Sequence, residues 1–191
     1  MVKKIVVIIL LITLSIFIYF KFSSQKKTSK IKINDDETVS YNSNILKNIQ
    51  YISKDEKGNE YIIKAEKGEI DLNNNNIIFL ENVRSKIKLS NSNEINIVSD
   101  YGKYNTNNYD TIFSKNVIIV YLNNKITGEY LDFSFFRNTM IISRNVIFTN
   151  LENILKADVI EVDIKTKDIK IFMYDQNKKV NIKNNNYNGN N

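Results

Sequence analysis

The sequence predicts an all-β fold of stacked antiparallel hairpin repeats, preceded by one N-terminal transmembrane helix. Three observations predict it: a repeat in the middle of the chain, alternation of apolar and polar residues within that repeat, and an apolar run near the N-terminus. Self-similarity at a period of roughly 20 to 50 residues indicates supersecondary units that stack and share one core. Alternation at every second position indicates strands with one buried face.

Segment 1–22 is predicted to be an uncleaved transmembrane anchor. Two lysines precede the apolar run IVVIILLITLSIFIYF at residues 5–20, and Lys21 follows it. About twenty apolar residues cross a bilayer, and lysines at both ends can reach the interfaces of a run at the short end of that length. The alternative is a cleaved signal peptide, but Phe22 stands where such a peptide needs a small residue.

The rest of the chain divides into three further segments. Residues 23–40 are polar, have no apolar periodicity and predict a tether. Residues 41–182 are predicted to form the β-domain, which opens with a hairpin whose strands are residues 45–53 and 61–65. Residues 183–191 are too polar to bury an apolar surface, so we expect them to be disordered.

The repeat sets an acidic residue sixteen positions before an Asn-Val pair. A fourth copy keeps the acid and replaces Asn-Val. The acids lie 34, 29 and 29 residues apart, so the spacing within a unit is fixed while the connections vary. The acid and asparagine of the three full copies are Glu66 and Asn82, Asp100 and Asn116, and Glu129 and Asn145, and the fourth acid is Asp158.

Each copy reads as a β-hairpin, since mostly apolar residues alternate with polar ones on both sides of an Asn-rich or Asp-rich turn. The residues expected on the apolar face of the outgoing strands are Gly68, Ile70 and Leu72; Gly102, Tyr104 and Thr106; Leu131, Phe133 and Phe135; and Ile160, Val162 and Ile164. Those expected on the return strands are Ile77 and Phe79; Thr111 and Phe113; Met140 and Ile142; and Ile169 and Ile171.

Three polar residues break this alternation just before Asn-Val: Glu81, Lys115 and Arg144. A β-bulge or a strand bend at that position would restore the phase beyond it. The sequence therefore predicts an irregularity at the same place in each hairpin.

Catalytic chemistry has little support in this composition. Histidine and cysteine are absent, and with them the commonest bases, nucleophiles and transition-metal ligands. The four repeat acids should form a row along the stack instead of converging on one site, and no calcium-binding spacing is present. The net charge of +6 reflects lysines around the apolar run. We expect no catalytic residue, no metal or other cofactor, and no nucleic-acid partner.

The anchor, the opening hairpin and the repeats together resemble the LptC family, the inner-membrane component of the lipopolysaccharide export system. The hairpin contributes Tyr51, Gly58 and the run YIIKA at residues 61–65. The resemblance extends from Met1 to about Ile182. LptA and the periplasmic part of LptD share the OstA-like repeats, and the uncleaved anchor separates this chain from them. The chain departs from the family where glycine often precedes Asn-Val.

The resemblance implies an open β-jellyroll whose apolar groove binds the acyl chains of lipid A. The groove-facing residues expected on this basis are Ile70, Leu72, Phe79, Tyr104, Phe113, Val117, Leu131, Phe133, Phe135 and Ile142. In such an open groove, Phe133→Asp would still fold and would lose lipid binding.

The resemblance also implies a location and partners. The chain would cross the inner membrane once, with its C-terminal domain in the periplasm, although lysines after the run outnumber those before it and the positive-inside rule alone favours the opposite orientation. The edge at residues 45–52 would meet LptF/LptG of the ABC transporter. The edge at residues 169–182 would receive an LptA-like periplasmic protein, towards which lipopolysaccharide moves on its way to the outer membrane.

Two other functions remain open from the residues. Cleavage after the apolar run would make the chain a soluble LptA-like periplasmic lipid shuttle. A closed core would make it a membrane-anchored structural or interaction protein without lipid cargo.

Overall fold

Eleven strands form one antiparallel sheet in the computed structural model, which describes residues 29–32, 44–54, 58–89, 93–134, 136–175 and 177–184. The predicted anchor, most of the predicted tether and the last seven residues lie outside these ranges. Within them, no helix is long and apolar enough to cross a membrane.

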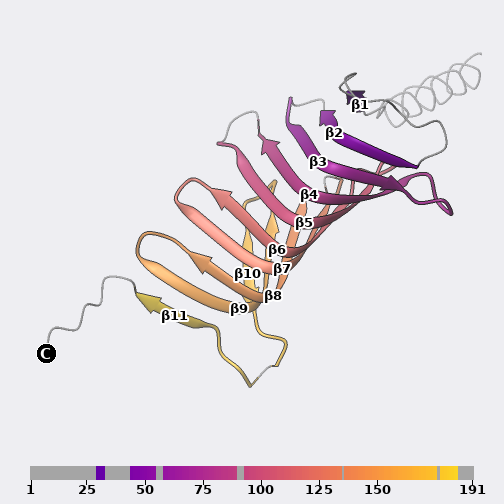
Figure 1. Ribbon diagram of the computed structural model, residues 1–191. Coiled ribbons are helices and arrows are strands. Elements are labelled where there is room, and N and C mark those ends of the chain that lie inside the picture. The colour runs from indigo at the N-terminus through magenta and orange to yellow at the C-terminus, as the bar shows by residue number, and fades with distance from the viewer. Residues whose placement is uncertain are drawn as a thin grey trace, which may run out of the picture.

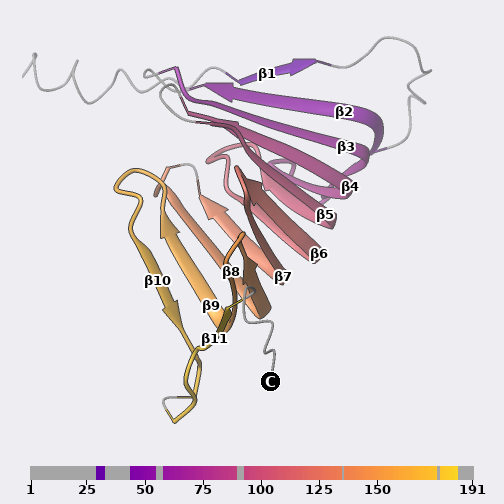
Figure 2. The ribbon, with the colours of Figure 1, turned by 90° about the vertical axis from the view of Figure 1, so that its left-hand side faces the viewer.

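The strands follow one another across the sheet in chain order from β1 to β10, and β11 also pairs with β9 (Figure 1). Figure 2 shows β1 beside β2 at one end of the stack, and β10 and β11 beside β9 at the other. The strands are β1 (Ser29–Lys32), β2 (Ile45–Lys54), β3 (Glu60–Ile70), β4 (Ile77–Lys88), β5 (Ile95–Asn105), β6 (Thr111–Tyr121), β7 (Asn124–Ser134), β8 (Thr139–Thr149), β9 (Asn153–Asp163), β10 (Ile169–Phe172) and β11 (Asn181–Asn184).

The predicted hairpins are confirmed. β2 and β3 form the opening hairpin, and the four repeats are the pairs β3–β4, β5–β6, β7–β8 and β9–β10. The structure adds two short strands at the ends of the domain. β1 lies within the segment predicted as a tether, and β11 overlaps the start of the segment predicted as disordered.

The strands β3, β4, β5 and β7 bend where they cross the row of repeat acids. In β3 the buried Ala65 and Gly68 flank the acid, and in β7 the buried Gly128 and Leu131 do the same. Side chains of a regular strand return to the same face every two residues. A step of three therefore turns the strand, so that its two parts belong to different layers.

We call these layers the first and the second leaf. The second leaf contains the parts of the strands next to the turns within the repeats, together with β10. The first leaf contains the parts on the other side of the acid row, together with β1 and β11. One continuous sheet thus supplies both layers of the domain.

Contacts between distant strands show that the two leaves face each other. The Tyr61 hydroxyl on β3 donates a hydrogen bond of 3.0 Å to Thr111 Oγ1 on β6. The Tyr61 and Phe133 ring centroids, on β3 and β7, lie 4.6 Å apart. In a flat sheet three strand spacings cover about 14 Å. The sheet therefore folds over on itself, an arrangement consistent with an open jellyroll.

The leaves are offset along the stack. Tyr51 on β2 meets Tyr104 on β5, with 4.9 Å between the ring centroids, and Tyr61 reaches β6 and β7. The first leaf of each strand thus covers the second leaf of strands three or four positions further along. The space between the leaves is filled at this end by fully buried side chains, which include Tyr61, Tyr104, Phe113, Leu131 and Phe133.

Candidate functional site

A hydrogen bond across the bend joins residues that lie sixteen positions apart in the repeat. The Asn82 side-chain amide donates to the Glu66 carboxylate at 2.7 Å, and Asn116 donates to Asp100 at 2.7 Å. In the fourth repeat the Asp158 carboxylate accepts the main-chain N–H of Tyr174 at 2.9 Å, again sixteen residues on. In these three repeats the acid thus joins the outgoing strand to the returning chain at the bend.

The irregularity predicted before Asn-Val is confirmed in the second and third repeats. Lys115 and Asn116 both have left-handed backbone, with φ of 60° and 51°, and the register shifts by one residue between Ser114 and Val117. β8 has the same arrangement at Arg144 and Asn145. Each return strand thus carries one extra residue, as a β-bulge requires.

The first repeat lacks the extra residue, and this overturns the predicted orientation of Phe79. Only Asn82 is left-handed there, and the register between β3 and β4 is unbroken. Phe79 has the same place in its repeat as Phe113, yet it lies on the outer face with 46% of its surface exposed. Ile78 and Leu80 face inward in its place. One missing bulge residue inverts the alternation.

Leu72 is also wrongly placed by the sequence pattern, since it lies outside the interior with 81% of its surface exposed. β3 ends at Ile70, and Asp71 closes the following turn by accepting the Asn73 N–H at 2.9 Å. Leu72 therefore lies beyond the end of the strand, where the alternation no longer applies. Phe135 lies outside the described residues.

The other expected groove residues do face the interior, but six of them are sealed within it. Ile70 is half-buried and packs against the core. The remaining six are at most 1% exposed: Tyr104, Phe113, Val117, Leu131, Phe133 and Ile142. These side chains form a closed core where an open groove was expected.

Buried tyrosines supply the polar atoms of this core. Burial raises the pKa of Tyr51 to about 12, and it raises the pKa of Tyr61 and Tyr104 as well. The hydroxyl of Tyr61 is satisfied by Thr111. These phenols stay neutral at physiological pH and serve the packing.

An apolar groove of about 370 Å³ does lie between the leaves, further along the stack. None of the nine expected residues that the structure describes lines it. Its walls are Leu89, Ile95, Ile119, Ile126 and Phe148 of the first leaf and its flanks, and Met140, Val162, Ile164 and Ile169 of the second leaf and its flanks. Tyr121, Asn124, Asp163 and Lys167 complete the lining with polar groups.

The residues of this groove could have been found from the sequence. Ile95, Ile119 and Ile126 continue the inward-facing alternation in the half-strands that precede the acid or follow Asn-Val. Most of the residues expected in the groove lie in the other half of each hairpin, which has the correct face of the sheet but forms the closed core.

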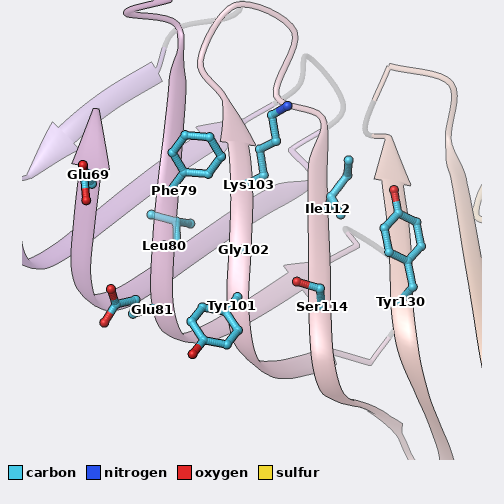
Figure 3. Close-up of a pocket in the computed structure, with 10 residues that line it drawn as sticks. All are labelled: Glu69, Phe79, Leu80, Glu81, Tyr101, Gly102, Lys103, Ile112, Ser114 and Tyr130. Carbon is cyan, nitrogen blue, oxygen red and sulfur yellow. The ribbon is translucent and has the colours of Figure 1, made fainter. Parts of the chain in front are cut away.

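A second hollow, of about 310 Å³, lies on the outer face of the second leaf. Figure 3 shows Phe79, Tyr101 and Tyr130 projecting from β4, β5 and β7 around it, with Glu81 and Lys103 on β4 and β5. The Lys103 ammonium lies 6.0 Å from the centroid of the Phe79 ring. This hollow combines aromatic surface with charge.

The residues that break the alternation also cover this outer face. Lys115 lies 5.0 Å from the centroid of Tyr101, and the Arg144 guanidinium lies 5.3 Å from that of Tyr130. At the equivalent place in the first repeat, Glu81 forms an ion pair of 2.8 Å with Lys67. Each of the three residues thus contacts a side chain of the preceding strand on the outer face of the sheet. No group of three or more metal-ligating side chains occurs in the part of the chain that the structure describes.

A protein-family model described as "Lipopolysaccharide-assembly, LptC-related" matches residues 6–190, nearly the whole chain. No curated protein matches the chain significantly. The family match agrees with the resemblance carried by the hairpin and the repeats, and LptC is a transport component, not a known enzyme family. The chain belongs to the LptC-related family of lipopolysaccharide-assembly proteins and has a role in lipopolysaccharide transport.

Proposed function

We propose that the chain is a membrane-anchored carrier that holds acyl chains of lipopolysaccharide in the groove between its two leaves. The observation that supports this proposal is the groove itself, which is lined mostly by aliphatic and aromatic side chains. Its volume of about 370 Å³ is within the range of roughly 300 to 1,000 Å³ that is typical of ligand pockets.

The chemistry of the groove suits an amphipathic ligand. Each methylene that leaves water for an apolar wall gains about 0.8 kcal/mol. Asp163 and Lys167 place charge at the edge of this apolar lining, where a polar headgroup would meet water. The six buried residues from Tyr104 to Ile142 form the packed floor next to the groove, and the lining residues make the direct contacts.

The proposed setting is the cell envelope. Residues 1–22 form a single inner-membrane helix, residues 23–40 connect it to the sheet, and residues 41–182 form an open β-jellyroll in the periplasm. At the β2 edge the jellyroll meets LptF/LptG of the ABC transporter, and at the β9 edge it passes lipid to an LptA-like protein. Addition of strand to strand at exposed sheet edges is a general mode of recognition and supports both contacts.

Phe148→Asp tests the groove. Phe148 is half-buried and lines the apolar wall, so a carboxylate there would lie where acyl chains bind. We expect a loss of at least about tenfold in affinity for a fluorescent acyl-chain probe, equivalent to about 1.4 kcal/mol. Photo-crosslinking to lipopolysaccharide from position 126 in cells should fall in parallel.

Val120→Asp is the matched control, since Val120 lies on the first leaf beside Ile119 but is 38% exposed. Its affinity for the probe should equal that of the parent. Retention of full affinity in a folded Phe148→Asp variant would rule out the groove as the binding site.

Two alternatives give different results in the same experiments. An anchored structural protein without lipid cargo would leave the parent chain unlabelled by the probe and by lipopolysaccharide. A soluble LptA-like shuttle would have lost the residues of the anchor, which the intact mass of the protein extracted from cells reveals.

A further inference from the structure

The outer edge of β9 is covered by two separate short strands. β10 pairs with residues 159–162 of β9, in the second leaf, and β11 pairs with residues 153–156, in the first leaf. The chain between them crosses the bend, where Asp158 binds the Tyr174 N–H. At the opposite end of the sheet, β1 covers the first-leaf part of β2 in the same way.

β11 buries little side-chain surface against β9. It has four residues, all of them exposed, and its only large apolar side chain, Ile182, remains 63% exposed although it lies opposite Leu155. By contrast, the other neighbour of β9 is the eleven-residue strand β8, whose inward side chains are buried in the core. Strands with exposed hydrogen bonds and few buried side chains open at low free energy.

The segment before β11 is anchored to the core of the domain. Met173 and Val180 pack against the hydrophobic core. Between them, the Asp175 carbonyl accepts the Lys178 N–H at 3.0 Å in a turn. β11 begins at the next residue after Val180, so it can leave β9 while the rest of the chain stays packed.

We infer that β11 is a displaceable strand, which occupies the first-leaf edge of β9 until an edge strand of a partner sheet replaces it. Removal of β11 would leave unpaired main-chain groups on β9 from Asn153 to Lys156, a template for strand addition. This inference rests on the proposed function for the identity of the partner, an LptA-like protein. It adds that the docking edge is closed in the free chain.

The register of β11 on β9 indicates which residues a replacing strand should have. The residue that takes the place of Ile182 lies opposite the buried Leu155 and should be apolar. The residues on either side replace Asn181 and Lys183, which face solvent, and should be polar.

A disulfide lock tests the inference cleanly, because the chain has no cysteine. Asn181→Cys with Lys156→Cys joins a directly opposed pair in which both positions are exposed. Lys64→Cys with Arg84→Cys is the matched control, an exposed and opposed pair on β3 and β4. A third variant ends at Val180 and lacks β11. The two disulfide variants are prepared as the full chain and the third variant as residues 1–180, all in detergent.

Binding of a purified LptA-like protein should follow the state of β11. We expect affinity to fall at least about tenfold in the oxidised lock, to recover on reduction, and to rise in the variant that ends at Val180, because a binding edge that is rarely free lowers the apparent affinity. The control disulfide should have no effect. Equal affinity of the oxidised lock and the parent overturns the inference.

Two further readouts separate this inference from the proposed function. Amide hydrogen exchange in the parent should be much faster for β11 than for β3 to β8, and core-like protection of β11 overturns the inference without any partner. All forms should take up the acyl-chain probe equally, so a failure to bind probe counts against the groove alone. If no form binds the LptA-like protein while all bind probe, the docking edge is refuted and the groove stands.

Discussion

At the level of single residues, three phenylalanines of the repeats differ in their depth within the sheet. Phe113 and Phe133 lie on the inner face and are completely buried, whereas Phe79 lies on the outer face. The alternation of side chains predicted the inner face for all three. It failed at Phe79 because one bulge residue, present in the second and third repeats and absent from the first, changes the facing of the positions that precede it in the return strand. Burial depth was beyond the pattern, since it depends on which residues of the other leaf lie opposite.

Phe133→Asp and Phe79→Asp measure this difference. Phe133 is 0% exposed and packs on Tyr61, so its replacement should cost about 4 kcal/mol or more, a large part of a typical stability of 5 to 15 kcal/mol. This reverses the expectation of a folded variant that an open groove had suggested. The measurement is urea unfolding followed by circular dichroism.

The same substitution at Phe79 is the comparison. Because Phe79 is 46% exposed, we expect a loss of about 1 kcal/mol or less. Comparable damage from the two variants would contradict the assignment of these rings to opposite faces.

At the level of the strand pair, the sequence revealed a spacing without its cause. In the first and second repeats the interval between acid and asparagine corresponds to a hydrogen bond between the two side chains across a bend in neighbouring strands. The fourth repeat dispenses with asparagine since a main-chain N–H reaches the same acid. Hairpin boundaries were readable from the turns, whereas the bends were not, because no local propensity marks a three-residue step in an outgoing strand.

Asn116 stabilises its hairpin in two ways, through its hydrogen bond to Asp100 and through its tolerance of left-handed backbone. Asn116→Gly removes the exposed hydrogen bond to Asp100 and leaves a residue that accepts left-handed backbone, so it should cost about 1 kcal/mol. Asn116→Ala removes the same hydrogen bond and keeps a Cβ at φ of 51°, a conformation that asparagine tolerates better than alanine, so it should cost about 1 kcal/mol more. The two free energies of unfolding are compared in urea. An alanine variant as stable as the glycine variant would show that the backbone at this bend relaxes without strain.

At the level of the whole molecule, the sequence predicted a stack with two open ends, and the structure shows how the stack closes. The repeat count, the chain order of strands and the edges are local properties of hairpins, and they were predictable. The offset by which one leaf covers the other results from the twist of the whole sheet. The position of the groove follows from that offset, so it could not be read from any single repeat.

The proposed orientation in the membrane is tested by a reporter that is active only in the cytoplasm. Fused after Asn184, it should be silent, because the β-domain is proposed to lie in the periplasm. The same reporter fused before Met1 should be active and serves as the control. Strong activity from the C-terminal fusion would place the domain in the cytoplasm and exclude a periplasmic carrier.

The bond between Tyr61 and Thr111 joins residues fifty positions apart, and this sets an order on biosynthesis. While the ribosome makes β2 and β3, no later residue exists to cover their apolar side, however well the hairpin itself has formed. Contacts of such long range slow folding, since loop-closure entropy is lost before burial compensates for it. A nascent chain that stalls before Thr111 therefore leaves Tyr61 in water, available to chaperones and proteases until the second half of the sheet arrives.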